Sequence, residues 1–316
     1  MSDLPFGHLA LAEGEEFDAI RALLAVWGAR ATGIGDDAAV MDVPAHERLV
    51  VSTDASLEGV HFRREWLSPR QIGARATAAA LSDLAAMAAT PIGLLLALGL
   101  PDSWRAELAE LAHGVGEMAA WACCPIVGGN VTRASELSLT ITVLGSAAQP
   151  LSRDAARAGQ ALYVTGRLGG PGAALAAMLR HAVPDAAHLA RFAQPRPRLD
   201  EARWLAARGA RAAIDVSDGL AADAAHLASA SGVALEVELA WIPCASGVDA
   251  ERAIASGEEY ELLVTFDEGS PPDVGAFEAE FSVPLTRIGR VVRGAGVTLA
   301  RAGGRVDPPR GHDHLS

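Results

Sequence analysis

Residues 212–219 read Ala212-Ala213-Ile214-Asp215-Val216-Ser217-Asp218-Gly219 and show the kind of fold that the whole chain has. The apolar run Ala212–Val216 predicts a buried strand, and a helical pattern begins at Gly219 and continues to Ser231. Two carboxylates, those of Asp215 and Asp218, therefore lie where a strand turns into a helix. A strand that leads through a polar turn into a helix is typical of α/β proteins.

The same alternation extends outward in both directions along the chain. Further strands are predicted over residues 48–53, 92–100, 125–127, 137–145, 161–165, 233–239, 261–266, 286–292 and 297–301. Further helices are predicted over residues 15–27, 68–89, 104–123, 171–180, 199–208 and 273–281. The segment Ala147–Ala158 contains Pro150 and many small and polar residues, which indicates a boundary between domains 1–148 and 149–316. We therefore predict a two-domain α/β protein with mixed sheets.

Composition and charge exclude several functional classes. The 316 residues carry a net charge of −13, which argues against nucleic acid or an anionic membrane as a partner. All 26 basic residues are Arg, so neither a Lys Schiff base nor the Lys of a P-loop is available. A protein of this composition that handles phosphate must use Arg, backbone N–H groups or metal ions.

The cysteines and the apolar segments bear on the cellular compartment. The three cysteines, Cys123, Cys124 and Cys244, form no CxxC motif, so we expect neither a disulfide framework nor a zinc site. We see no signal peptide at the N-terminus, and apolar stretches such as Ile92–Leu100 are too short to span a bilayer. The cytoplasm is the expected compartment.

The most informative residues are aspartates at predicted strand ends and in glycine-rich turns. They are Asp36 and Asp37 after Gly35, Asp54 after Ser52-Thr53, Asp83 in an Ala- and Leu-rich helix, and the pair Asp215 and Asp218. Mg²⁺ takes one or two carboxylates per ion together with water and substrate phosphate, so several converging aspartates suit several ions. Each signal also has a structural explanation: Gly-Asp-Asp is a common turn, Ser217 or Asp218 can cap a helix, and Asp83 can pair with an Arg.

Seven segments, taken in order, resemble the thiamine-monophosphate kinase family of the aminoimidazole ribonucleotide synthetase superfamily. The segments are Gly33–Val40, Ser52–Phe62, Leu81–Met87, Val127–Arg133, Ala213–Leu220, Ser256–Leu262 and Gly311–Leu315. They span nearly the whole chain, and their combination is specific although no single segment is. The resemblance implies the two-domain aminoimidazole ribonucleotide synthetase-like fold, with ATP and several Mg²⁺ ions in the cleft between the domains. It further implies a homodimer formed through the sheet of the N-terminal domain, which also binds ATP and Mg²⁺.

The resemblance also assigns roles to individual residues. The family's metal positions correspond to Asp37, Ser52, Thr53, Asp54, Asp83, Asp215 and Asp218. Its ATP positions correspond to Gly129, Asn130, Arg153 and Ser217, and its substrate positions to His61 and Glu258. Asp54, Asp215 and Asp218 are expected to be catalytic. The implied reaction transfers the γ-phosphoryl group of ATP to thiamine monophosphate, a small-molecule substrate, and gives thiamine diphosphate and ADP.

The chain departs from the family pattern at several positions. Asn130 stands in place of the Asp of a Gly-Gly-Asp-Thr motif, and Ala80 replaces the Asn before Leu-Ser-Asp. Residues 256–260, Ser-Gly-Glu-Glu-Tyr, replace Gly-Gly-Glu-Asp-Tyr, and Pro309 stands where the family has a substrate-stacking aromatic. Three functions therefore stay open: an active thiamine-monophosphate kinase, a related kinase for another small molecule, and a non-catalytic ATP-binding protein.

Overall fold

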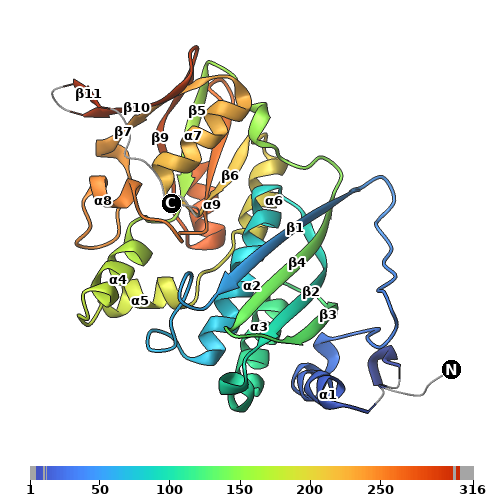
Figure 1. Cartoon of the computed structure of the whole chain (residues 1–316). Coiled ribbons are helices and arrows are strands. Elements are labelled where there is room, and N and C mark those ends of the chain that lie inside the picture. Colours follow the sequence, from blue (N-terminus) through green and yellow to red (C-terminus); the bar gives the residue numbers. More distant parts are fainter. Residues whose placement is uncertain (1–4, 10, 12, 302–303, 307–316) are drawn as a thin grey trace. The chain divides into compact units, whose positions relative to one another are not determined.

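The computed structural model describes residues 5–9, 11, 13–301 and 304–306. The chain divides into two compact units, the first formed by Met1–Leu84 with Ala89–Gln149 and the second by Ala85–Ala88 with Pro150–Ser316. Each unit has its own sheet (Figure 1). The predicted mixed α/β fold is confirmed. Pro309 and the rest of the tail lie outside the described residues. Among the described residues, no helix is long and apolar enough to cross a membrane.

The first unit contains a four-stranded sheet with the strand order β1-β4-β2-β3. Its strands are β1 (Arg48–Leu57), β2 (Thr90–Leu100), β3 (Ile126–Arg133) and β4 (Ser138–Ala147). Its helices are α1 (Glu15–Trp27), α2 (Pro69–Ala86) and α3 (Leu108–Trp121). β2 and β3 are parallel, whereas β4 runs antiparallel to both β1 and β2. Leu139, Ile141 and Val143 of β4 are buried, as their alternation predicts.

Glycines allow α2 and α3 to approach each other closely. A Cβ at Gly73 would lie 2.3 Å from the backbone oxygen of Leu111, and one at Gly114 would lie 2.0 Å from that of Arg70. Any larger residue at either position would push the helices apart. This close contact fixes α2, which carries Asp83.

The second unit contains a seven-stranded sheet with the order β11-β10-β7-β9-β5-β8-β6. Its strands are β5 (Gln160–Thr165), β6 (Ala213–Val216), β7 (Ala234–Glu238), β8 (Glu261–Asp267), β9 (Leu285–Val292), β10 (Gly296–Arg301) and β11 (Gly304–Val306). Its helices are α4 (Gly170–Leu179), α5 (Ala186–Ala193), α6 (Leu199–Ala207), α7 (Leu220–Ser231), α8 (Ala250–Ile254) and α9 (Val274–Phe281). Among the described strands of this unit, only β7 and β10 pair in parallel.

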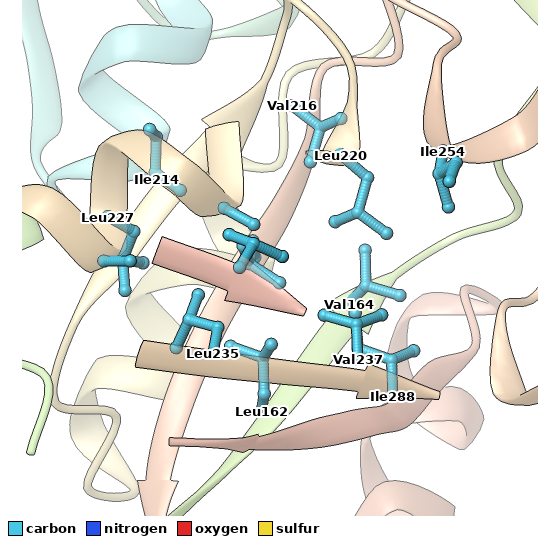
Figure 2. Packing of buried hydrophobic residues seen from close by; sticks show 14 of the residues in the cluster. Leu162, Val164, Ile214, Val216, Leu220, Leu227, Leu235, Val237, Ile254 and Ile288 are labelled. Atoms are coloured by element: carbon cyan, nitrogen blue, oxygen red, sulfur yellow. The ribbon is translucent and has the colours of Figure 1, made fainter. Parts of the chain in front are cut away.

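The core of the second unit lies between this sheet and α7. Val216 and Leu220, on either side of the Ser217–Gly219 turn, belong to one buried cluster with Leu162, Val164 and Ile214 (Figure 2). The turn is thus anchored at both ends by side chains that are at most 1% exposed. Burial of apolar side chains stabilises by ~1.5–3 kcal/mol each, so the position of the turn is strongly determined.

Several details differ from the sequence-based expectation, and the helix α8 and the strand β11 are among the elements that were not predicted. β1 continues to Leu57, so Ser52, Thr53 and Asp54 lie within the strand and not at its end, because β4 supplies hydrogen-bonding partners along its full length. β3 likewise continues through Gly129 and Asn130 to Arg133. α5 was not predicted, although Asp185 caps it by accepting hydrogen bonds from the N–H groups of Ala187 and His188.

Candidate functional site

The turn between β6 and α7 brings together three aspartates of the second unit. Asp215 is 4% exposed in β6, and Asp218 is half-buried in the turn. Asp223, in the first turn of α7, is 2% exposed, and its Oδ2 accepts hydrogen bonds from the N–H groups of Ser217 (3.0 Å) and Asp218 (3.1 Å). A buried carboxylate that accepts two backbone N–H groups fixes their direction. Sequence reasoning missed Asp223, although an aspartate in a first helical turn is a known capping signal.

Electrostatics give this turn the properties of a cation site. Burial and the negative charges of Asp215 and Asp218 together raise the pKa of Asp223 to about 8, although the hydrogen bonds from the N–H groups of Asp218 and Ser217 oppose the shift. The carboxylates of Asp215 and Asp218 thus disfavour the charge of Asp223. A divalent cation would offset this repulsion, and a set of oxygen donors is what Mg²⁺ prefers. Asp215 and Asp218 therefore supply oxygen donors of the type that the predicted ion takes, but the three aspartates are not arranged as a complete metal site by themselves.

The segment Ser256–Tyr260 runs beside this turn. The N–H of Glu258 donates to the carbonyl of Ser217 (2.7 Å), and the N–H of Tyr260 donates to that of Val216 (2.8 Å). A predicted nucleotide position, Ser217, and a predicted substrate position, Glu258, are therefore joined by a backbone hydrogen bond. The structure brings these two residues together.

Beneath this segment lies a buried network of ion pairs. Glu259 and Glu261 are buried, and Arg191 donates to Oε2 of Glu259 (3.4 Å) and to Oε1 of Glu261 (2.9 Å). Arg198 forms two further hydrogen bonds to the carboxylate of Glu261. Burial alone would raise the pKa of Glu261, but the charges of Arg198 and Arg191 hold it below its ordinary value. The network fixes the start of β8, into which the segment leads.

Arg153, a predicted ATP position, lies in a 3₁₀ turn at the opposite end of α7. Its side chain is exposed, and its backbone carbonyl accepts a hydrogen bond from the hydroxyl of Ser231 (2.6 Å), the last residue of that helix. Because α7 is one continuous helix, it holds the backbones of Arg153 and Asp218 at a fixed separation.

In the first unit, Ser52 and Asp83 come together from β1 and α2. The hydroxyl of Ser52 donates to Oδ2 of Asp83 (2.5 Å), so this carboxylate in an apolar helix has a polar partner. Asp54, two residues along the strand, has its side chain on the same side of the sheet as Ser52. Thr53 points the opposite way, where its hydroxyl lies 3.0 Å from that of Thr142.

Gly129 and Asn130 are neighbours on β3, at the edge of the sheet. Gly129 has φ +154°, and a Cβ there would lie 1.9 Å from the carbonyl oxygen of Leu96, so only glycine fits. Asn130 pairs with Ala97, which pairs with Thr140 of β4, and its side chain is exposed. Thr140 in turn pairs with Ala55 of β1, which lies on the same face of the sheet as Thr53. Asn130 and Thr53 therefore lie on one face, and Asp54 lies on the other.

His61 is held at the end of β1 by its own ring nitrogen. Nδ1 accepts a hydrogen bond from the N–H of Leu57 (3.1 Å), which places the proton of the neutral imidazole on Nε2. The preceding Glu58 accepts hydrogen bonds from Trp104 Nε1 (2.8 Å) and from the N–H of Leu137 (3.4 Å). The loop that presents His61 is therefore anchored on both sides.

Asp37 lies in an exposed loop before β1, where its N–H donates to Asp36 Oδ1 (2.8 Å), as expected for a Gly-Asp-Asp turn. Over residues 5–9, 11, 13–301 and 304–306, no group of three or more His, Cys, Asp or Glu side chains is arranged to hold a metal ion. Mg²⁺ sites commonly keep several waters and use substrate phosphate as a ligand.

Comparisons with known proteins agree with the fold of both units. The N-terminal domain described as AIR synthase related protein matches residues 35–147, and the corresponding C-terminal domain matches residues 157–301. A thiamine-monophosphate kinase from Rhodopirellula baltica is 37% identical over 84% of this chain and 85% of its own length. The crystal structure of a thiamine-monophosphate kinase from Stenotrophomonas maltophilia K279a has a TM-score of 0.81 at 35% identity, covering 92% of this chain and 97% of that one. A structure described as AaThiL complexed with AMPPCP and TMP has a TM-score of 0.76 at 29% identity, covering 94% of this chain and 95% of that one.

Proposed function

Because the chain belongs to the thiamine-monophosphate kinases of the AIR synthase related family, we propose that it transfers the γ-phosphoryl group of ATP to thiamine monophosphate. The products are thiamine diphosphate and ADP, so the protein is an ATP-dependent phosphotransferase. The observation that carries this proposal is the match along 94% of the chain to a relative complexed with an ATP analogue and TMP. We further propose the cytoplasm as its compartment, because ATP is available there.

Mg²⁺ is proposed to act with residues of each unit. In the first unit (proposed as residues 1–148) the ligands are Asp37, Ser52, Thr53, Asp54 and Asp83, and in the second (149–316) they are Asp215 and Asp218. The bound ions would neutralise phosphate charge during transfer. The convergence of Asp215 and Asp218 at the turn that Asp223 holds supports this assignment, because carboxylate oxygens are ligands that Mg²⁺ prefers.

The remaining proposed roles follow from how the side chains are held. The proposed ATP-binding residues are Arg153, Ser217, Gly129 and Asn130. Arg153 would contact ATP through its guanidinium, and Ser217 lies in a turn that Asp223 holds rigid. His61 and Glu258 bind thiamine monophosphate. The acceptor is a phosphate monoester with a second pKa of about 6, so it is ionised near neutral pH and needs no strong general base. Positioning and charge neutralisation then supply most of the rate enhancement.

We also propose that the chain forms a homodimer through the exposed face of the first unit's sheet. Leu49, Val51 and Leu57 of β1 are 50%, 54% and 37% exposed on this face. Exposed apolar side chains in a row along a strand favour a second copy as the partner. Val51→Glu should convert the dimer to a monomer in light scattering, whereas Val183→Glu, at a 96% exposed position of the other unit, should not. A monomeric wild-type protein would contradict this proposal.

The reaction is tested by measuring ADP release from ATP and Mg²⁺ with and without thiamine monophosphate, with the thiamine products separated by chromatography. We expect ADP release to depend on thiamine monophosphate and to match thiamine diphosphate formation one to one. A protein that binds ATP but is not stimulated by this acceptor would refute the proposal. A panel of other phosphate monoesters and small alcohols would then identify the acceptor of a related kinase.

A further inference from the structure

The segment Ser256–Tyr260 is held in a strained backbone conformation. Glu258 has φ +64° and Tyr260 has φ +53°, and neither is glycine. A residue other than glycine in this region costs ~1–3 kcal/mol and persists only when its surroundings enforce it. Here the N–H groups of both residues donate to carbonyls of Ser217 and Val216, which enforces the strained path.

Close backbone approach makes the path still more specific. A Cβ added at Gly257 would lie 2.7 Å from the carbonyl oxygen of Ser217, so the segment and the turn are in direct backbone contact. Strained residues of this kind concentrate at sites where a side chain must be aimed at a ligand. The side chain aimed by this segment is that of Glu258, which is half-buried.

Tyr260 fixes the direction of that carboxylate. Its ring is only 8% exposed, and its hydroxyl donates to Oε2 of Glu258 (2.5 Å). A buried tyrosine hydroxyl needs a hydrogen-bond partner, and a bond to a charged acceptor contributes ~1.5–3 kcal/mol. Glu258 and Tyr260 are two positions apart in the chain. Both have a left-handed backbone conformation, and in this conformation the Tyr260 hydroxyl lies next to the Glu258 carboxylate.

We propose that Tyr260 is a positioning residue for the phosphate acceptor, which orients the Glu258 carboxylate toward the organic part of that substrate. This inference rests on the proposed function, in which Glu258 contacts thiamine monophosphate. That molecule carries a positively charged thiazolium ring and an amino group, and both are complementary to an oriented carboxylate. Tyr260 therefore governs acceptor binding and not the transfer step.

The test is Tyr260→Phe, which removes one oxygen and keeps the ring. We expect the KM for thiamine monophosphate to rise about tenfold, the loss of ~1.4 kcal/mol of binding. The kcat and the KM for ATP should change by less than about twofold. The matched control is Tyr163→Phe, because Tyr163 is the only other tyrosine of the chain and is 5% exposed against Phe266 in the same unit. Its kinetic constants should equal those of the wild type.

A double-mutant cycle with Glu258→Ala, which leaves no acceptor for the hydroxyl, shows whether the hydroxyl acts through Glu258. The two changes should be strongly non-additive on the KM for thiamine monophosphate, because each breaks the same hydrogen bond. Additive effects, an unchanged KM in Tyr260→Phe, or equal rises in the KM of both substrates with a lowered Tm would each overturn the inference. The wild-type assay distinguishes failure of this inference from failure of the proposed function. If thiamine monophosphate stimulates ADP release by the wild type but Tyr260→Phe changes nothing, the positioning role is wrong and the proposed function stands.

Discussion

Replacing Glu259 by Gln should make the protein more stable at neutral and alkaline pH. The side chain is fully buried, and its Oε1 accepts hydrogen bonds from the N–H of Gly169 (2.5 Å) and the hydroxyl of Ser256 (2.6 Å). Burial raises the pKa of Glu259 to about 7, although the Ser256 hydroxyl and the charge of Arg191 oppose the shift. Gln keeps the size and an acceptor oxygen but cannot ionise.

The magnitude follows from the two pKa values. The ordinary value is 4.5 and the folded value about 7, a difference that corresponds to about 3 kcal/mol at ~1.4 kcal/mol per unit. Because the folded pKa is the higher one, the stabilisation from the protonated carboxyl is fully present below pH 4.5 and is lost as the pH rises through about 7. Relative to the wild type, the Gln variant should therefore gain about 3 kcal/mol of unfolding free energy between pH 4.5 and 8.

Urea denaturation of both proteins at intervals from about pH 4.5 to 8.5, with a chelator present, measures this difference. Glu278→Gln is the control, because Glu278 lies exposed on α9 and should follow the wild type at every pH. A stability difference between Glu259→Gln and the wild type that does not vary with pH would refute the reasoning. It would mean that Glu259 is ionised across the whole range and that Arg191 outweighs its burial.

Three further predictions concern the metal and nucleotide positions. Asp218→Asn should reduce Mg²⁺-dependent ADP release by about 100-fold or more, and unchanged turnover would count against Asp218 as a ligand. Asn130→Asp should lower the Mg²⁺ concentration for half-maximal activity by about tenfold, because a carboxylate replaces a neutral amide, and an unaltered Mg²⁺ titration would mean that this position binds no ion. Gly129→Ala should lower the unfolding free energy by ~3 kcal/mol or more, because its Cβ meets the backbone of Leu96 at 1.9 Å. Gly128→Ala, whose Cβ contacts only a flexible Leu95 side chain at 3.2 Å, should be milder in the same denaturation assay, and equal losses would contradict the backbone clash.

The fold class was predictable because its signals are local. The strand β4 shows strict alternation, and the change of period from β6 to α7 is visible in the residues themselves. The end of β1 was predicted wrongly, because the polar residues Ser52-Thr53-Asp54 are typical of a turn. Its continuation depends on pairing with β4, about 90 residues away in sequence, and no local pattern reports that pairing.

The candidate site residues stay predictions from the sequence, and the contacts that support them could not be predicted from it. Asp215 and Asp218 were identified from residue type and order. Asp223, which holds the turn between them and α7, looked like an ordinary helix residue. The hydrogen bond from Tyr260 to Glu258 depends on two positive φ values at residues that rarely adopt them. Supporting contacts of this kind follow from backbone geometry, which residue type alone does not determine.

Two of the departures from the family motif contact each other. Ser256 stands in place of Gly and Glu259 in place of Asp, and the Ser256 hydroxyl donates to the Glu259 carboxylate while also accepting the N–H of Gly172. Together they accept the N–H groups of Gly169 and Gly172 at the start of α4. The longer acid and the added hydroxyl therefore act as a pair, next to Glu258 and Tyr260 in the chain. Such a change supports the segment without altering Glu258 or Tyr260. Asn130 differs, because it is an exposed residue where the exchange of a carboxylate for an amide directly removes a charge. Among these departures, Asn130 is therefore where this chain should differ most in its dependence on Mg²⁺.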